Sequence, residues 1–326
     1  MILGDNMDYS NIEVNKKLKI IFMGTPEFSV PILEGLLQKY EVRAVVTQPD
    51  RVSKNNKVNI PPVKEIANNN TILVLQPENI NDSADIILSL EPDLIITCAY
   101  GQKIPKAILD YPRLGCINVH ASLLPKLRGG APIHRAIING HKQTGITIMH
   151  MNEGLDQGDI ISQEIVEITE QDNASSLHEK LSNVGRDLLI KTLPSIIDGT
   201  APRTPQNKEE ATFAFVIKRE DEKINFSKTK KQIYNQIRGL NSWPGAYCYF
   251  TGKILKVWES YTTDRFFPSA FDGQITAIYD DGFGVKVSNG EIVFTVVQLE
   301  GKNKMKANDF INGFKNKDEL IGKILD

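Results

Sequence analysis

Short hydrophobic runs rich in β-branched residues recur through the first two hundred residues of the chain. Stretches with helical spacing of apolar residues lie between several of them, at residues 28–39, 83–90 and 104–110. The runs themselves lack polar alternation, which is typical of strands buried on both faces. They lie at residues 18–24, 42–48, 72–76, 93–100, 117–121 and 145–151. The pattern predicts an α/β fold with a doubly wound, mostly parallel sheet.

A different pattern begins after a long predicted helix at residues 175–197. The segment 198–214 contains two prolines and few apolar residues, so it indicates a linker. After another predicted helix at 229–240, alternating strands follow at 247–260, 273–280, 284–288 and 291–301. Turn dipeptides at Thr251-Gly252, Asp281-Gly282 and Asn289-Gly290 separate them. This part predicts a C-terminal β-barrel domain resembling the OB fold.

The two patterns together divide the chain into four parts. We expect an N-terminal extension at 1–17, a catalytic α/β domain at 18–200, a linker at 201–218 and the OB-like domain at 219–326. The length of 326 residues fits two domains of ordinary size.

Composition and charge narrow the class of protein. Charged residues make up 24% of the chain and the formal net charge is −2, so a polycation of the histone type is excluded. Residues 1–209 carry 21 basic and 25 acidic side chains, and residues 210–326 carry 17 and 15, which permits a nucleic-acid partner for the second domain. No apolar run is long enough for a membrane span, and the polar N-terminus argues against a secretory signal. The three cysteines, Cys98, Cys116 and Cys248, form neither a disulfide framework nor a metal-binding motif, so we expect no metal and a cytoplasmic protein.

The densest chemical signal follows the strand at 117–121. Side chains alternate along a strand, so Asn118 and His120 point to the same face. Ligands of doubly wound sheets bind beyond the carboxyl ends of the strands, which directs attention to the segments after them. Those segments are 47–50, 98–101, 118–125 and 150–156, the last of which ends at Asp156 between Gly154 and Gly158.

An amide, an imidazole and a carboxylate suggest transfer of an acyl-type group. Histidine titrates near neutrality, a carboxylate can orient it, and a fixed amide N–H can stabilise an oxyanion. Neither a serine nor a cysteine nucleophile is clearly placed, which favours direct transfer. A structural role for His120 is the alternative. The loop Gly24-Thr25-Pro26-Glu27 resembles a phosphate loop but lacks the dinucleotide and P-loop motifs.

These residues resemble the folate-dependent formyltransferases. The resemblance is carried by Asn118-x-His120, by SLLPKLRG at 122–129 and by GLDQGD at 154–159. Further segments resemble those members of the family that formylate methionyl initiator tRNA, and the resemblance extends over nearly the whole chain from about residue 19. They include IIFMGTPEFSVPIL (20–33), CAYGQKIPKAIL (98–109), IRGLNSWPGAY (237–247) and GKNKMKANDFINGF (301–314).

The resemblance implies an activity and a set of site residues. The enzyme would take a formyl group from 10-formyltetrahydrofolate, with no metal, and place it on the α-amino group of methionyl initiator tRNA for translation initiation. By matching motif, Asn118, His120 and Asp156 would be catalytic. The implied folate-binding residues are Ser122, Leu123, Leu124, Pro125, Cys98, Ala99, Tyr100, Gly101, Met151 and Asn152. The resemblance also favours a monomer, with folate and tRNA as its partners and no membrane, in a bacterial cytoplasm.

Basic residues in two places are candidates for contact with the tRNA. They are Arg51, Lys54 and Lys57 in the segment 51–60, and Lys302, Lys304 and Lys306 beside a strand end in the second domain. Contacts of this kind with phosphates weaken as salt rises. The alternative for the first segment is an ordinary solvated loop.

Two other functions remain open at this stage. The first is a folate-dependent N-formyltransferase that acts on an amino sugar nucleotide, since the site chemistry would be shared. The second is a non-catalytic RNA-binding protein. The matching segments of the second half argue against the first alternative, and the intact set of Asn118, His120 and Asp156 argues against the second.

Overall fold

A computed structural model describes residues 15–53 and 56–326 of the chain. It contains two compact units, each assembled from separate stretches of sequence. The first unit comprises the chain up to Arg128 with Gly145–Ile165 and Glu179–Ala211. The second comprises Gly129–Thr144, Val166–His178 and Thr212–Asp326. The predicted domain boundaries at 18–200, 201–218 and 219–326 stay a prediction, and most of the expected extension, residues 1–14, lies outside the described residues.

A seven-stranded sheet forms the centre of the first unit, in the order β5-β2-β1-β6-β7-β8-β9. Its first five strands pair in parallel, whereas β8 runs antiparallel to β7. The predicted mostly parallel sheet is therefore confirmed. The strands are β1 (Asn15–Gly24), β2 (Tyr40–Val46), β5 (Leu73–Leu75), β6 (Leu94–Cys98), β7 (Cys116–His120), β8 (Gln143–His150) and β9 (Ile160–Glu167).

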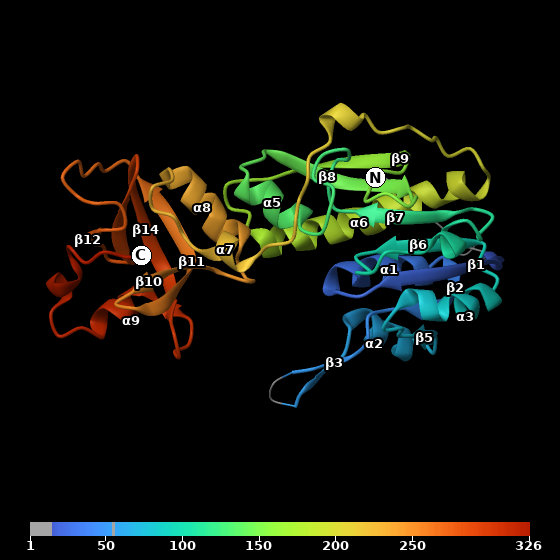
Figure 1. Cartoon of the computed structure of the whole chain (residues 1–326), viewed down its shortest axis with the longest axis horizontal. Coiled ribbons are helices and arrows are strands. Elements are labelled where there is room, and N and C mark those ends of the chain that lie inside the picture. The colour runs from blue at the N-terminus through green and yellow to red at the C-terminus, as the bar shows by residue number, and fades with distance from the viewer. Residues whose placement is uncertain (1–14, 54–55) are drawn as a thin grey trace, which may run out of the picture. The chain divides into compact units, whose positions relative to one another are not determined.

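Helices cover both faces of this sheet, as a doubly wound fold requires (Figure 1). On one face, Ile21 and Met23 of β1 belong to a buried cluster with Ile87 and Ile108 from two helices. On the other face, Gly185 approaches Val119 of β7 so closely that a Cβ there would lie 3.2 Å from its side chain. The helices are α1 (Val30–Leu37), α2 (Pro62–Asn69), α3 (Ala84–Ser89), α4 (Lys106–Leu109) and α6 (Ala174–Ile197), with short 3-10 turns at Glu27–Ser29, Ile80–Ser83 and Lys208–Glu210.

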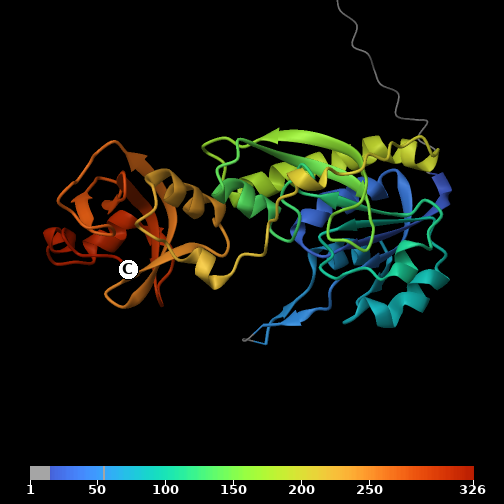
Figure 2. The same cartoon turned by 45° about the horizontal axis from the view of Figure 1, so that its top comes forward.

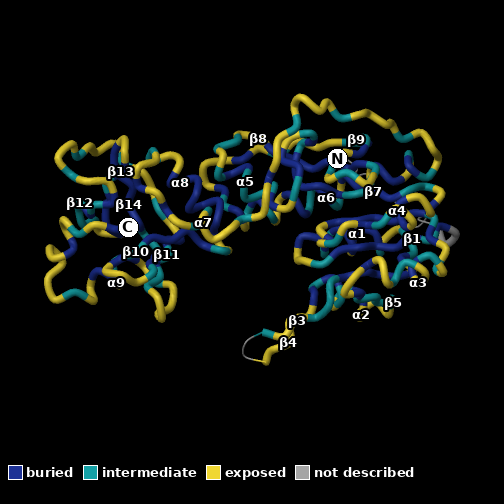
Figure 3. Tube along the Cα trace, viewed as in Figure 1, coloured by how far each residue is buried: buried dark blue, intermediate teal, exposed yellow. Residues whose placement is uncertain are grey.

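A short hairpin replaces the loop that the sequence predicts after residue 50. Its strands, β3 (Arg51–Val52) and β4 (Val58–Asn59), pair antiparallel and are exposed. Figures 1 and 2 show the hairpin extending from the sheet, and Figure 3 shows how it differs from the buried central strands. Val52 and Val58 face each other across it, which explains the pairing of an otherwise polar segment.

The second unit is built around an antiparallel sheet in the order β10-β11-β14-β13-β12, with β15 beside β14. This confirms the predicted C-terminal antiparallel β domain. The predicted run 247–260 is divided at Thr251-Gly252, where both residues have a positive φ and form the turn. The strands are β10 (Ala246–Phe250), β11 (Lys253–Thr263), β12 (Ile275–Ile278), β13 (Phe283–Val287), β14 (Gly290–Leu299) and β15 (Met305–Lys306).

One apolar cluster forms the core of the second unit. Ile233 and Ile237 contribute to it from α8, and Phe310 contributes from α9, together with the inner face of the sheet. Thr229 caps α8, because its hydroxyl accepts from the Gln232 backbone while the Gln232 side chain accepts from the Thr229 backbone. The helices of this unit are α5 (Pro132–Ile138), α7 (Arg219–Glu222), α8 (Lys230–Gly239) and α9 (Ala307–Asn312), with a 3-10 turn at Lys317–Leu320.

Candidate active site

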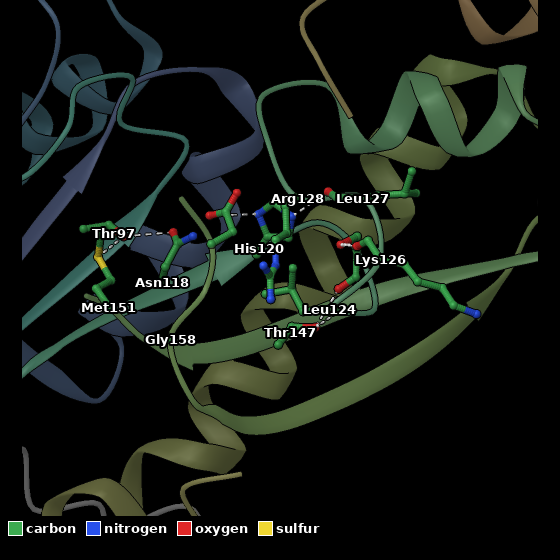
Figure 4. Close-up of polar contacts among 12 residues, drawn as sticks. Thr97, Asn118, His120, Leu124, Lys126, Leu127, Arg128, Thr147, Met151 and Gly158 are labelled. Atoms are coloured by element: carbon green, nitrogen blue, oxygen red, sulfur yellow. Dashed lines mark hydrogen bonds and ion pairs between the residues drawn. The ribbon is translucent and has the colours of Figure 1, made fainter. Parts of the chain in front are cut away.

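Two polar side chains project from the carboxyl-terminal half of β7. Asn118 and His120 lie two residues apart and therefore on the same face of the strand (Figure 4). The neighbouring β6 runs parallel, with Thr97 directly opposite Asn118. The segment at Cys98–Gly101, which follows β6, is thereby brought to the same edge of the sheet as His120. This placement was expected from the strand pattern alone.

Thr97 orients the amide of Asn118. The Thr97 hydroxyl donates to the Asn118 Oδ1 at 2.8 Å. An amide whose oxygen accepts from Thr97 turns its Nδ2 protons away from that residue, which is how Figure 4 draws it. Asn118 is thus held as a hydrogen-bond donor, the form in which it can stabilise negative charge on an oxygen atom.

His120 is 6% exposed, and each of its ring nitrogens faces an oxygen atom. Its Nε2 lies 3.1 Å from the Leu127 backbone oxygen. A carbonyl can only accept, so Nε2 must carry a proton. The other nitrogen, Nδ1, lies 3.7 Å from the Asp156 Oδ1. The lone pair of the neutral ring is therefore at Nδ1, on the side of Asp156.

The loop that carries Asp156 reaches His120 by an unexpected path. The strand pattern predicts that residues 150–156 lie at the same edge as His120, because they follow a strand. That reasoning is wrong, because β8 is antiparallel: His150 at its end lies opposite Ile117, near the start of β7. The loop reverses direction after Met151 and brings Asp156 back to His120. Asp156 has a φ of +49°, a conformation that aspartate tolerates better than most residues.

Gly158 allows this reversal. A Cβ at this position would lie 1.7 Å from the His150 backbone oxygen, so the two backbones meet more closely than any other residue permits. At Gly154, on the other side of the loop, the three atoms nearest to a Cβ would belong to the side chains of Gln157 and Asn152.

The turn at residues 122–125 is pinned to the sheet by Thr147 of β8. The Thr147 hydroxyl donates to the Ser122 backbone oxygen at 2.6 Å and accepts from the Leu124 backbone N–H at 3.1 Å. Gln163 of β9 donates to the same hydroxyl at 2.8 Å and to the Leu124 oxygen at 2.9 Å. The peptide bond between Leu124 and Pro125 is cis. The four hydrogen bonds from Thr147 and Gln163 hold the turn in place beside His120.

The other expected folate-binding residues differ in their accessibility. Ala99, Gly101 and Asn152 are exposed, and Met151 and Leu123 are partly so. The Cys98 side chain is fully buried, and burial raises the pKa of its thiol to about 12. Tyr100 is 4% exposed, yet its hydroxyl has no hydrogen-bond partner among the described residues. Burial raises the pKa of Tyr100 to about 12 as well, so the hydroxyl stays protonated and can donate.

Those expected tRNA-binding residues that the structure describes lie on exposed surfaces. Arg51 and Lys57 belong to the β3–β4 hairpin region, and Lys54 lies outside the described residues. In the second unit, Lys302, Lys304 and Lys306 are exposed around the turn between β14 and β15. The Lys304 Nζ lies 5.2 Å from the ring centre of Trp258.

The described residues, 15–53 and 56–326, contain neither a candidate metal cluster nor a candidate membrane-spanning helix. No group of three or more His, Cys, Asp or Glu side chains in these ranges is placed to hold a metal ion. No helix in the same ranges has the length and apolar character to span a membrane.

Comparison with known proteins assigns the family. The model of the formyl transferase family matches residues 16–193, and the model of the formyl transferase C-terminal domain matches residues 216–315. The chain belongs to the formyl transferase family.

Individual relatives of this formyl transferase agree with the assignment. The methionyl-tRNA formyltransferase of Bacillus licheniformis is 51% identical over 300 residues, which cover 90% of this chain and 95% of the relative. Among solved structures, the N-formyltransferase of Helicobacter canadensis, in complex with folinic acid and dTDP-3-aminofucose, has a TM-score of 0.64 at 22% identity and covers 85% of this chain and 98% of that chain. HypX of Aquifex aeolicus has a TM-score of 0.65 at 16% identity and covers 93% of this chain, which spans about half of HypX. These two likenesses show the fold alone.

Three residues of this formyl transferase's site were not found from the sequence. Thr97 orients Asn118, and its only signal was a hydroxyl within the otherwise apolar run of β6. Arg128 lies in the segment SLLPKLRG, where no local pattern marks its contact with Gln206. Gln206, which contacts the backbone of Asp156, lies in the predicted linker, where no local pattern marks it.

Proposed function

We propose that this chain transfers the formyl group of 10-formyltetrahydrofolate to the α-amino group of methionine carried by initiator tRNA, for translation initiation. The observation that supports this most is the identity of 51% to a methionyl-tRNA formyltransferase over almost the whole of both chains. The alternative substrate, an amino sugar nucleotide, is not favoured, since the sugar formyltransferase resembles this chain at only 22% identity.

The site residues can divide the chemistry of direct transfer among them. The methionyl nitrogen attacks the formyl carbon, a C–N bond forms, and negative charge develops on the formyl oxygen. Asn118 donates through Nδ2 to that oxygen, an interaction typically worth 10²–10³ in rate at such positions. His120 accepts the proton of the attacking amine at Nδ1, and Asp156 stabilises the imidazolium. The bond to the folate nitrogen then breaks, and that nitrogen receives the proton.

The residues near the site suit a folate. The folate supplies the formyl carbon. Its ring system is flat and has several hydrogen-bonding atoms along its edge. A flat ring system can lie against the exposed and partly exposed residues beside the site. They are Ala99, Gly101, Leu123 and Met151, together with the turn after Ser122. The unpaired hydroxyl of Tyr100 offers a donor that the described residues leave unused.

Exposed cations support the assignment of the nucleic-acid partner. Arg51 and Lys57 on the first unit, and Lys302, Lys304 and Lys306 on the second, can contact phosphates without desolvating a buried charge. A monomer working in the bacterial cytoplasm also belongs to this proposal.

The test is a formyl-transfer assay with three acceptors. Purified protein and 10-formyltetrahydrofolate are mixed with methionyl initiator tRNA, with uncharged tRNA or with an amino sugar nucleotide. We expect transfer to the charged tRNA alone, and preferential transfer to the amino sugar nucleotide would contradict the proposal. With the tRNA, His120→Ala and Asp156→Asn should lower kcat by orders of magnitude while circular dichroism stays unchanged. Near-normal kcat in either variant would refute the roles given to these residues.

A further inference from the structure

One glutamine connects the predicted linker to the loop of Asp156. Gln206 follows Thr204, whose backbone pairs in both directions with Ile160 at the start of β9. The Gln206 Nε2 donates to the backbone oxygens of Asp156 at 2.9 Å and of Gly158 at 2.8 Å. A single side chain therefore binds the loop at the residue that faces His120 and again two residues later.

The other end of the same amide is held by Arg128. The Gln206 Oε1 accepts from the Arg128 Nε at 3.1 Å and from its Nη2 at 2.7 Å. Both amide protons and both lone pairs of Gln206 are thus engaged. Reversing the amide would place its NH2 group against a guanidinium that can only donate, so the contacts fix its orientation.

Arg128 is itself anchored within the site. It is 4% exposed and directly follows Leu127, whose carbonyl accepts from His120. In Figure 4 the Arg128 side chain lies beside His120. Arg128, Gln206 and the loop backbone therefore connect the segment that follows His120 to Asp156, whose carboxylate faces His120.

The loop needs such a support. It contains neither a helix nor a strand between Met151 and Asp159, and its path depends on Gly158 and on the positive φ of Asp156. A carboxylate placed by such a backbone moves whenever the backbone moves. Displacement of about 1 Å at a reacting group can cost about 10²-fold in rate.

We propose that Gln206, oriented by Arg128, is a positioning residue that holds Asp156 against His120 during formyl transfer. The inference rests on the proposed function for its reaction, although the contacts themselves do not. Gln206 touches neither substrate in this account and acts through the backbone of Asp156.

Two substitutions separate the two halves of the contact. Gln206→Ala removes all four hydrogen bonds. Gln206→Glu keeps an acceptor for Arg128 but places carboxylate oxygens against the two loop carbonyls, which can only repel it. Both variants should lower kcat by about 30- to 100-fold, with KM for the charged tRNA within about threefold of the parent. A Gln206→Glu enzyme with nearly full kcat would overturn the proposal, since Arg128 would then be the only partner that matters.

A double-mutant cycle with Asp156 tests whether Gln206 acts through it. In an Asp156→Ala background, the further change Gln206→Ala should lower kcat by less than threefold, because the carboxylate to be positioned is already gone. A multiplicative loss would mean that Gln206 has only a general structural role, and the proposal would be wrong.

Arg203→Gln is the matched control. Arg203 joins the same two segments through an ion pair with Asp159 at 3.5 Å, but its side chain is 64% exposed and its partner is the carboxylate of Asp159 rather than the backbone of Asp156. We expect kcat within about twofold of the parent. A loss equal to that of Gln206→Ala would show that tethering of these segments in general, and not the contact of Gln206 with Asp156, maintains kcat, and the proposal would be wrong.

Hydrogen exchange provides a measurement that does not depend on the acceptor. In Gln206→Ala, amides of the segment 151–160 should exchange at least tenfold faster, while those of the β-sheet core stay unchanged. Unchanged exchange in this segment would overturn the proposal even if the parent protein formylates tRNA. Absence of transfer by the parent would instead count against the proposed function alone.

Discussion

Replacing Gly158 by alanine should cause a large loss of activity with little loss of fold. The added Cβ would lie 1.7 Å from the His150 backbone oxygen and 2.8 Å from the carbonyl carbon. Neither atom can rotate away, because both belong to the backbone at the end of β8. The Met151 N–H, which donates to the Cys116 oxygen at 2.8 Å, further restrains that strand end.

The size of the effect follows from the displacement that this contact demands. The Cβ and the oxygen must separate by about 1.3 Å to reach the 3.0 Å that real Cβ contacts approach at the closest. The loop is the freer of the two partners, so Asp156, two residues away, moves with it. A shift of this order costs about 10²-fold in kcat, equivalent to about 2.7 kcal/mol in activation free energy. Overpacking at this buried position should lower the stability of the fold by only about 1–3 kcal/mol.

Single-turnover formyl transfer to methionyl initiator tRNA is the appropriate assay. Rates are corrected for the folded fraction, measured by circular dichroism at the assay temperature. Gly154→Ala is the control in the same loop, because the nearest atoms to its Cβ belong to the side chains of Gln157 and Asn152 and not to the backbone. We expect that control to remain within about threefold of the parent. A Gly158→Ala rate within threefold of the parent would refute the argument that the close approach at Gly158 places Asp156.

Two further predictions concern stability. Thr147→Val keeps the side-chain shape but leaves the Leu124 N–H without its acceptor. The free energy of unfolding, measured in urea, should fall by about 1–3 kcal/mol. A change below about 0.5 kcal/mol would contradict the role of this hydroxyl. Glu170 pairs with Lys142 at 2.8 Å and with Lys231, and hydrogen bonds from these lysines hold its pKa at about 2. Because this pKa is lowered on folding, the pairs stabilise the protein above the unfolded pKa of about 4.3 and lose that effect as pH falls towards 2. Glu170→Gln should therefore lower the free energy of unfolding by about 0.5–1 kcal/mol at pH 7, a value reduced by the 46% exposure of the side chain. Near pH 2 the substitution should have no effect on stability. A difference in stability that does not change with pH would contradict this role of Glu170.

Local patterns predicted the central features of the site. Asn118 and His120 share a face because alternation along a strand is a property of two neighbouring residues. The long helix predicted at 175–197 is observed at Ala174–Ile197, since its apolar stripe persists over several turns. The turn at Thr251-Gly252 was equally visible, because glycine adopts positive φ at no steric cost.

Features that depend on distant residues were not predictable in this way. An apolar run does not state its direction, so the antiparallel β8 and the reversed path to Asp156 could not be anticipated from residues 145–151. The strand β9 was missed because half of its positions are exposed and the sequence lacks an apolar run. Gln206 lies 50 residues beyond Asp156 in a polar, proline-containing segment, and only the folded chain brings the two together.

The peptide oxygen of Leu127 also limits the route that a proton can take through the imidazole. With Nε2–H committed to that oxygen, His120 cannot pass a proton from one side of its ring to the other. A proton that binds at Nδ1 has to leave from Nδ1, so the group that donates the proton and the group that receives it must each lie next to Nδ1 in turn. Such an arrangement suits a reaction in which an entering nitrogen and a departing nitrogen exchange places on one carbon, because a single basic atom then serves both without any path to bulk solvent.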